Sequence, residues 1–142
     1  MSDRKIVLSI EDNEDIASLI RLVIRHAPVE LLHASNAEEA QKFLETQTPD
    51  LILLDMMLPG MTGIDFLEKM RQDKRYEKTP VIIITVRAEA SYRKRAQELG
   101  VIRYLLKPFS PTVLRQEIQQ AISVNWRETG TLGGLPTLKI KK

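Results

Sequence analysis

Cysteine is absent from the 142-residue sequence, which excludes a disulfide framework, a thiol nucleophile and a thiolate metal site. Aromatic residues are scarce at 5%, and no apolar stretch approaches the roughly 20 residues of a membrane-spanning helix. The N-terminal segment MSDRKIVLSI breaks its apolar run at Ser9 and continues into EDNED, so it lacks the apolar core of a signal peptide. We expect a cytoplasmic protein that does not bind a membrane.

An excess of charge of one sign is also lacking. The 21 basic and 19 acidic residues leave a formal net charge of +2, so the sequence does not indicate a protein that binds nucleic acid directly. With 43% hydrophobic residues, the chain fits a single globular domain. After Trp126 the composition changes to glycines, a proline and a basic end. We predict a domain over residues 1–126 and a tail or linker over residues 127–142.

Five short segments rich in Ile, Leu and Val recur along the chain, and three of them are apolar at consecutive positions. This pattern is typical of strands that are covered on both faces. Helical patterns lie between them, as in the stripe formed by Ile16, Leu19, Ile20, Val23 and Ile24. The five predicted strands are KIVLSI (5–10), VELLHA (29–34), DLILLD (50–55), PVIIIT (80–85) and IRYLLK (102–107).

Helix start signals support this alternation. Ser35 and Glu38 have the spacing of a capping box, and Ser110 lies before a proline as an N-cap residue often does. Weaker helical patterns cover about residues 64–74 and 88–98. Five strands alternating with five helices give a parallel sheet with right-handed crossovers. We therefore predict an α/β fold, a flavodoxin-like three-layer (βα)5 sandwich whose five-stranded parallel sheet has the order 2-1-3-4-5.

Polar side chains follow these strands at the edge where parallel strands end together. Glu11 and Asp12 follow the first strand, Asp55 ends the third, and Thr85 and Lys107 end the fourth and fifth. Each residue alone has an ordinary structural explanation, such as a helix cap, a turn or a solvated amine. Together they are harder to explain, because like charges about 4 Å apart repel by ~4 kcal/mol at an effective dielectric constant of 20. A cation must neutralise the three carboxylates.

Oxygen ligands in an open cleft suit Mg²⁺, which keeps several waters and accepts phosphate oxygens. The ammonium group of Lys107 can contact a phosphoryl oxygen, and the hydroxyl of Thr85 can donate to another. The third carboxylate, Asp55, can act as a nucleophile. This combination favours phosphoryl transfer to an aspartate.

With these motifs in place, the chain resembles the receiver domain of two-component response regulators, from about Lys5 to Ala121. The resemblance rests on the acidic pair in SIEDNED, the block LLDMMLPGMTG, the strand end IIIT and the segment YLLKPF, in this order. It implies a phosphorylation-dependent switch, not an enzyme, similar to the stand-alone chemotaxis regulators. Asp55 would accept a phosphoryl group from a phosphohistidine of a sensor histidine kinase or histidine phosphotransfer protein in a Mg²⁺-dependent reaction.

The resemblance also implies the metal ligands. Asp12 and Asp55 would bind Mg²⁺ directly together with the backbone carbonyl of Met57, and Glu11 would bind directly or through water. Lys107 would bind the phosphoryl group.

The same resemblance implies how the signal is passed on. Thr85 would move toward the phosphoryl oxygen, and Tyr104 would change rotamer and report the state on the face formed by the fourth helix, fifth strand and fifth helix. The peptide bond between Lys107 and Pro108 is expected to be cis. The partner on that face is an unidentified downstream protein, and the expected state is a monomer or a weak, phosphorylation-dependent homodimer.

The chain departs from the family pattern at several positions. Val86 stands where relatives usually have a small residue, and its branched side chain would crowd the approach to the acceptor; ordinary packing is the other explanation. Met57 and Arg87 lie where relatives tune the lifetime of the aspartyl phosphate, and their bulk predicts slow autodephosphorylation. Ile102 and Arg103 replace acidic residues that pair across the dimer of one DNA-binding subfamily, which weakens the case for that dimer.

Basic residues gather on the expected signalling face. They indicate either an acidic partner or a solvated helix surface, and the sequence does not decide between the two. These residues are Arg87, Arg93, Lys94, Arg95 and Arg103.

Other classes of protein share parts of the pattern. A phosphatase with an aspartyl nucleophile needs a second aspartate where this chain has Met57, and a flavin module needs a glycine- or hydroxyl-rich phosphate loop where this chain has acids. A receiver that binds partners without being phosphorylated stays open because of Val86. A receiver fragment of a longer regulator also stays open, although we favour a stand-alone receiver.

Overall fold

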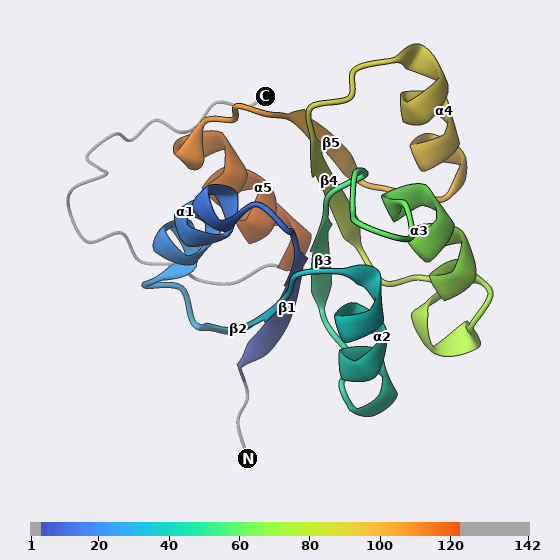
Figure 1. Ribbon diagram of the computed structural model, residues 1–142. Coiled ribbons are helices and arrows are strands. Elements are labelled where there is room, and N and C mark those ends of the chain that lie inside the picture. Colours follow the sequence, from blue (N-terminus) through green and yellow to red (C-terminus); the bar gives the residue numbers. More distant parts are fainter. Residues whose placement is uncertain (1–3, 123–142) are drawn as a thin grey trace.

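The computed structural model describes residues 4–122, so the predicted tail at 127–142 lies outside the described residues. Five parallel strands form one sheet in the order β2-β1-β3-β4-β5, with a helix after each strand (Figure 1), and this confirms the predicted α/β fold. The elements are β1 (Lys5–Ile10), α1 (Glu14–Ile24), β2 (Val29–Ala34), α2 (Ala37–Thr46), β3 (Leu51–Leu54), α3 (Gly63–Arg71), the 3-10 turn η1 (Lys74–Tyr76), β4 (Val81–Thr85), α4 (Ala90–Glu98), β5 (Arg103–Leu106) and α5 (Pro111–Ile122).

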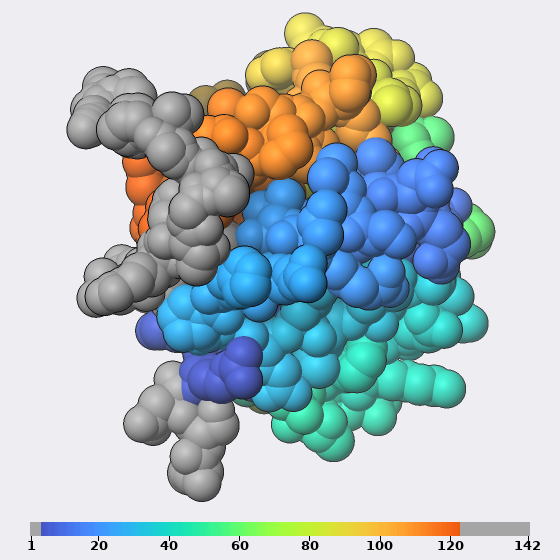
Figure 2. Space-filling model, turned by 90° about the vertical axis from the view of Figure 1, so that its left-hand side faces the viewer, coloured from blue at the N-terminus to red at the C-terminus, as the bar shows by residue number. Residues whose placement is uncertain are grey.

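Helices cover both faces of the sheet, as continuous apolar strands require. On one face, α1 and α5 pack on alternate residues of the central strands, such as Leu53 and Ile82. Figure 2 looks onto this side and shows α1 in blue next to the orange C-terminal part of the described chain. On the other face, α2 and α3 cover the intervening residues, such as Ile52 and Leu54. None of the helices within residues 4–122 has both the length and the apolar composition that crossing a bilayer demands.

The helix caps confirm one sequence signal and correct another. Ser110 caps α5, because its hydroxyl accepts a hydrogen bond from the backbone N–H of Val113 at 3.3 Å. The predicted capping box at Ser35 is wrong by one residue: Asn36 is the N-cap of α2, and its side chain accepts from the N–H of Glu39 at 2.9 Å. The side-chain oxygen of an asparagine caps a helix as well as a serine hydroxyl does, which is why the neighbouring residue can take this position.

The end of α3 is fixed by a half-buried arginine that the sequence pattern did not reveal. The helix predicted to reach residue 74 ends at Arg71, whose guanidinium donates to the backbone carbonyls of Leu99, Tyr76 and Thr79 at 2.8 to 2.9 Å. Burial lowers the pKa of Arg71. This side chain therefore joins the end of α3 to the segment before β4 and to the end of α4.

Candidate functional site

Backbone hydrogen bonds continue the sheet beyond the strand ends and bring the predicted site residues to one edge. The N–H of Asp55 donates to the carbonyl of Ile10 at 3.1 Å, and the N–H of Glu11 donates to a β2 carbonyl at 3.0 Å. The N–H of Lys107 donates to the carbonyl of Thr85 at 2.8 Å. Each of these site residues is thus placed by its neighbouring strand. The peptide bond after Lys107 is cis, as the resemblance implied.

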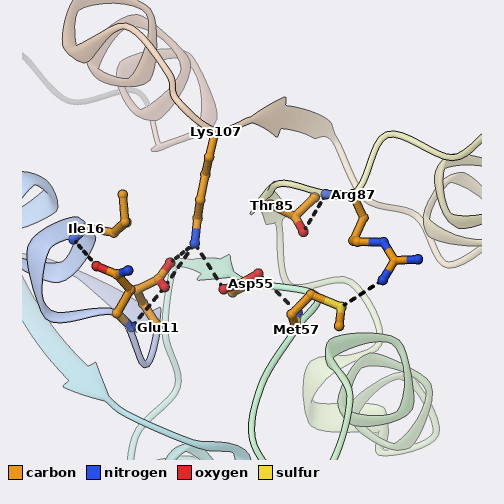
Figure 3. Close-up of polar contacts among 8 residues, drawn as sticks. Glu11, Ile16, Asp55, Met57, Thr85, Arg87 and Lys107 are labelled. Carbon is orange, nitrogen blue, oxygen red and sulfur yellow. Dashed lines mark hydrogen bonds and ion pairs between the residues drawn. The ribbon is translucent and has the colours of Figure 1, made fainter.

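Lys107 lies at the centre of this edge (Figure 3). Its Nζ atom is 3.0 Å from the carboxylate of Glu11 and 3.1 Å from Oδ2 of Asp55, and these contacts join residues 96 and 52 positions apart in the sequence. Both carboxylates are buried, with 2% of Glu11 and 4% of Asp55 exposed. The other oxygen of Asp55, Oδ1, accepts from the N–H of Met57 at 3.0 Å.

The burial of these charges changes their proton affinity. Burial raises the pKa of Glu11 to about 7; the hydrogen bond from Lys107 opposes this shift and the charge of Asp55 adds to it. Burial alone would lower the pKa of Lys107, but its hydrogen bonds to Glu11 and Asp55 outweigh this effect, so its pKa is raised. The lysine therefore stays charged, and the cluster holds more negative than positive charge.

Glu11, Asp12 and Asp55 form an acidic cluster in which one carboxylate oxygen from each lies within 4.8 Å of the others. Asp12 is exposed, so this cluster opens to solvent on one side. All three offer hard oxygen ligands, and one ammonium group cannot balance three carboxylates. The donor set and its charge therefore fit a divalent cation such as Mg²⁺.

Thr85 and Tyr104 are joined through the backbone of Arg87. The N–H of Arg87 donates to Oγ1 of the buried Thr85 at 3.2 Å, and the hydroxyl of Tyr104 donates to the Arg87 carbonyl at 2.8 Å. Burial raises the pKa of Tyr104. The sequence placed Thr85 at the site and the resemblance placed Tyr104 on the signalling face, but neither gave a signal for the connection between them.

Met57 and Arg87 meet at the rim of the site, as Figure 3 shows. Nη1 of Arg87 lies 3.8 Å from the sulfur of Met57, and the guanidinium also pairs with Glu89 at 2.6 Å. Met57 is 42% exposed and Val86, in the same loop as Arg87, is 63% exposed. The loops after β3 and β4 thus contact each other through Met57 and Arg87, two side chains whose contact the sequence did not predict.

The expected basic face is less basic than its sequence indicates, because acidic side chains of the same chain neutralise three of its arginines. Arg93 instead lies over the ring of Tyr104. The ion pairs are Arg87–Glu89, Arg95–Glu68 and Arg103–Glu117, each at 2.6 Å.

Gly63 is a site-forming residue that the sequence analysis included in the block LLDMMLPGMTG without giving it a role. A Cβ atom there would lie 2.4 Å from the carbonyl oxygen of Asp55 and 2.7 Å from Cα of Met56. The N–H of Gly63 also donates to the Met56 carbonyl at 2.8 Å. The absence of a side chain lets α3 begin against the backbone of Asp55 and Met56.

Comparisons with known proteins agree with this geometry. The model of the response regulator receiver domain matches residues 7–119. The phosphate regulon transcriptional regulatory protein PhoB of Pseudomonas aeruginosa is 32% identical over 126 residues, which are 89% of this chain and 53% of PhoB. The alkaline phosphatase synthesis transcriptional regulatory protein PhoP of Bacillus subtilis is 35% identical over 81% of this chain and 47% of PhoP. The chain thus spans about half the length of these curated relatives.

A solved structure shows the same fold. The receiver domain of the sensor histidine kinase PA1611 from Pseudomonas aeruginosa has a TM-score of 0.75 and 26% identity, covers 84% of this chain and 98% of that chain, and holds a magnesium ion in its active site cleft. The fold and the acidic edge define a flavodoxin-like signalling module. The chain belongs to the response regulator receiver domain family of two-component systems.

Proposed function

We propose that Asp55 is the phosphoacceptor of a signalling switch whose receiver domain covers residues 1–126. The observation that carries the proposal is the contact of Lys107 with both Glu11 and Asp55 at the carboxyl edge of the sheet. A lysine whose side chain is only 12% exposed, beside a buried carboxylate, suits a site that must receive a dianionic phosphoryl group. The family-model match over residues 7–119 supports the same conclusion.

The proposed step transfers a phosphoryl group from a phosphohistidine to Asp55. A carboxylate oxygen attacks phosphorus, the phosphorus–nitrogen bond breaks, and the imidazole nitrogen keeps the electron pair and takes up a proton. Lys107 holds a phosphoryl oxygen and offsets its charge, since its ammonium already lies 3.1 Å from the acceptor. The product is an acyl phosphate on the protein, so the domain changes state and does not act as an enzyme that turns over a substrate.

Asp12 and Asp55 with the backbone carbonyl of Met57 would hold Mg²⁺, and Glu11 would hold it directly or through water. The ion, when bound, neutralises the carboxylates and the phosphoryl oxygens. Without added positive charge, the cluster would repel an incoming phosphoryl dianion. The magnesium ion in the cleft of the PA1611 receiver domain supports this assignment.

Thr85 and Tyr104 would pass the change to the face of α4, β5 and α5. The Thr85 hydroxyl would donate to a phosphoryl oxygen. Its oxygen accepts a hydrogen bond from the N–H of Arg87, and the carbonyl of Arg87 accepts one from the Tyr104 hydroxyl, so both hydroxyls are tied to the same loop. The phosphodonor would be a sensor histidine kinase or a histidine phosphotransfer protein, and the target an unidentified downstream protein. We propose a cytoplasmic protein that is a monomer or a weak, phosphorylation-dependent homodimer. The pairing of Arg103 with Glu117 within the chain supports the weak self-association.

Slow autodephosphorylation is part of the proposal. Met57 and Arg87 contact each other at one side of Asp55, and both side chains would obstruct a water molecule that attacks the acyl phosphate. Replacing Met57 with Asn should therefore shorten the lifetime of the phosphoprotein severalfold. The measurement is the decay of the phosphoryl adduct by intact mass after removal of the donor. An unchanged lifetime in the Met57→Asn variant would contradict this role.

The main test is intact mass after incubation with Mg²⁺ and acetyl phosphate. We expect one phosphoryl adduct on the wild-type protein and none on Asp55→Asn or after chelation of the metal ion. An adduct that survives in Asp55→Asn would place the acceptor elsewhere. No adduct on the wild type, even with a phosphorylated histidine partner, would favour a receiver that binds partners without phosphorylation, with the exposed Val86 as the first residue to change.

A further inference from the structure

Helix α4 has little apolar surface of its own to hold it against the domain. Within Ala90–Glu98 the single buried side chain is Ala96, and Tyr92 is half-buried. The N-cap residue, Glu89, makes no side-chain capping bond. Other contacts must therefore fix the position of this helix.

Arg93 supplies one of these contacts. Its guanidinium carbon lies 4.8 Å from the centre of the Tyr104 ring, within the range of a cation–π interaction. The same two side chains line a hollow of about 310 Å³ between α4 and β5. Arg93 therefore joins the middle of α4 to the residue that the proposed function makes the reporter of phosphorylation.

Tyr104 is held at both ends in this arrangement. Arg93 covers the ring, and the Arg87 carbonyl accepts the hydroxyl hydrogen bond at 2.8 Å. The Arg87 N–H donates in turn to Thr85, so a movement of the Thr85 hydroxyl shifts the acceptor of the Tyr104 hydroxyl. A continuous set of contacts runs from the acceptor edge through the Arg87 backbone and Tyr104 to Arg93 on α4.

We propose that Arg93 is a positioning residue that sets the rotamer equilibrium of Tyr104 and couples it to the placement of α4. The inference rests on the proposed function, because it takes Tyr104 as the switch residue. Arg93 stabilises the conformation in which the ring lies beneath α4. Any change of Tyr104 then removes a support of α4, and loss of Arg93 lowers the population of the observed Tyr104 conformation.

The test compares Arg93→Gln with Lys94→Gln. Both variants remove one positive charge from an exposed position of the same helix, but Lys94 is not the residue that covers the Tyr104 ring. NMR spectra of ¹³C-labelled tyrosine, assigned with Tyr104→Phe, report the rotamer population. Hydrogen exchange of the α4 amides reports how firmly the helix is held.

We expect Arg93→Gln to lower the population of the observed Tyr104 rotamer relative to its alternatives by about two- to fivefold, the range of an exposed cation–π contact. Exchange of the α4 amides should accelerate by a similar factor, Arg93→Lys should restore part of the effect, and Lys94→Gln should match the wild type. Equal Tyr104 populations in Arg93→Gln and Lys94→Gln would overturn the inference.

The failure of this inference is distinguishable from the failure of the proposed function. If the wild type takes up one phosphoryl group on Asp55 while Arg93→Gln leaves the Tyr104 population unchanged, only the role of Arg93 is wrong. If the wild type takes up no phosphoryl group, the proposed function is wrong, and Arg93 has no switch to position.

Discussion

Gly63→Ala tests how the fold places Asp55, the proposed acceptor. A Cβ atom at residue 63 would lie 2.4 Å from the Asp55 carbonyl oxygen, where real Cβ contacts stay above 3.0 Å, so the two segments must separate by roughly half an ångström. The atoms that clash are backbone atoms and cannot rotate away. Such overpacking costs about 1–3 kcal/mol of folding free energy. It also displaces Asp55 from Lys107 and from the other proposed metal ligands, and a misplacement of about 1 Å can slow a reaction ~100-fold.

Gly60→Ala is the matched control, in the loop that leads into α3. Gly60 has φ +85°, and a Cβ atom there would meet nothing within 4 Å, so the cost comes only from the left-handed backbone. That cost is about 1–2 kcal/mol, close to the cost at Gly63. Urea denaturation measures stability, and the rate of adduct formation from acetyl phosphate measures function.

The two variants should lose similar stability but differ in phosphorylation. We expect Gly63→Ala to react roughly tenfold or more slowly than the wild type, since its backbone overlap falls on the acceptor residue. Gly60→Ala should react within about twofold of the wild type, because its strain is local to the turn. Equal phosphorylation rates in the two variants would refute the claim that the close approach of Gly63 positions Asp55.

Three further predictions concern ionisable side chains. Lys107→Met should slow phosphorylation by about 100-fold or more, measured by intact mass, since the ammonium that contacts both carboxylates is lost; a near-normal rate would contradict its role. Arg71→Met should lower the free energy of unfolding, measured in urea, by about 2–4 kcal/mol, because three backbone carbonyls lose a charged donor. A decrease below ~1 kcal/mol would mean that water replaces the guanidinium. Burial lowers the pKa of His33 below 6.5, so the unfolded state binds the proton more tightly and stability should fall as the pH drops below about 6.5. His33→Gln should reduce this dependence of the unfolding free energy on pH, and an unchanged dependence in that variant would contradict the assignment to His33.

The sheet could be predicted well from the sequence because buried parallel strands leave a local signal. The bounds expected for β1 and β2, residues 5–10 and 29–34, agree with the structure at every residue. The strand order then follows from a small set of allowed topologies. The helices were harder to predict from the sequence, as α4 shows, because it has almost no apolar face. Its start was expected at residue 88, whereas the helix begins at Ala90.

Contacts between distant loops could not be predicted, because no local pattern records them. The sequence placed Glu11, Asp55 and Lys107 at one edge but did not show that the lysine touches both carboxylates. It also counted Arg103 among the basic residues of the expected signalling face but did not show that Glu117 of α5 neutralises it. Such pairs depend on side-chain directions that are fixed only when the elements pack.

The charges around Asp55, the proposed acceptor, explain why phosphorylation would change the conformation of the domain and not only the chemical composition of the site. Phosphorylation replaces one negative charge on Asp55 with roughly two, and Lys107 is already shared between two carboxylates. A further hydrogen-bond donor is therefore needed near the phosphoryl group. The Thr85 hydroxyl can supply it, because its oxygen accepts from the Arg87 N–H and its hydrogen can turn toward the new charge. Since the carbonyl of the same Arg87 holds Tyr104, the charge balance at the acceptor is linked to the surface of α4 and β5.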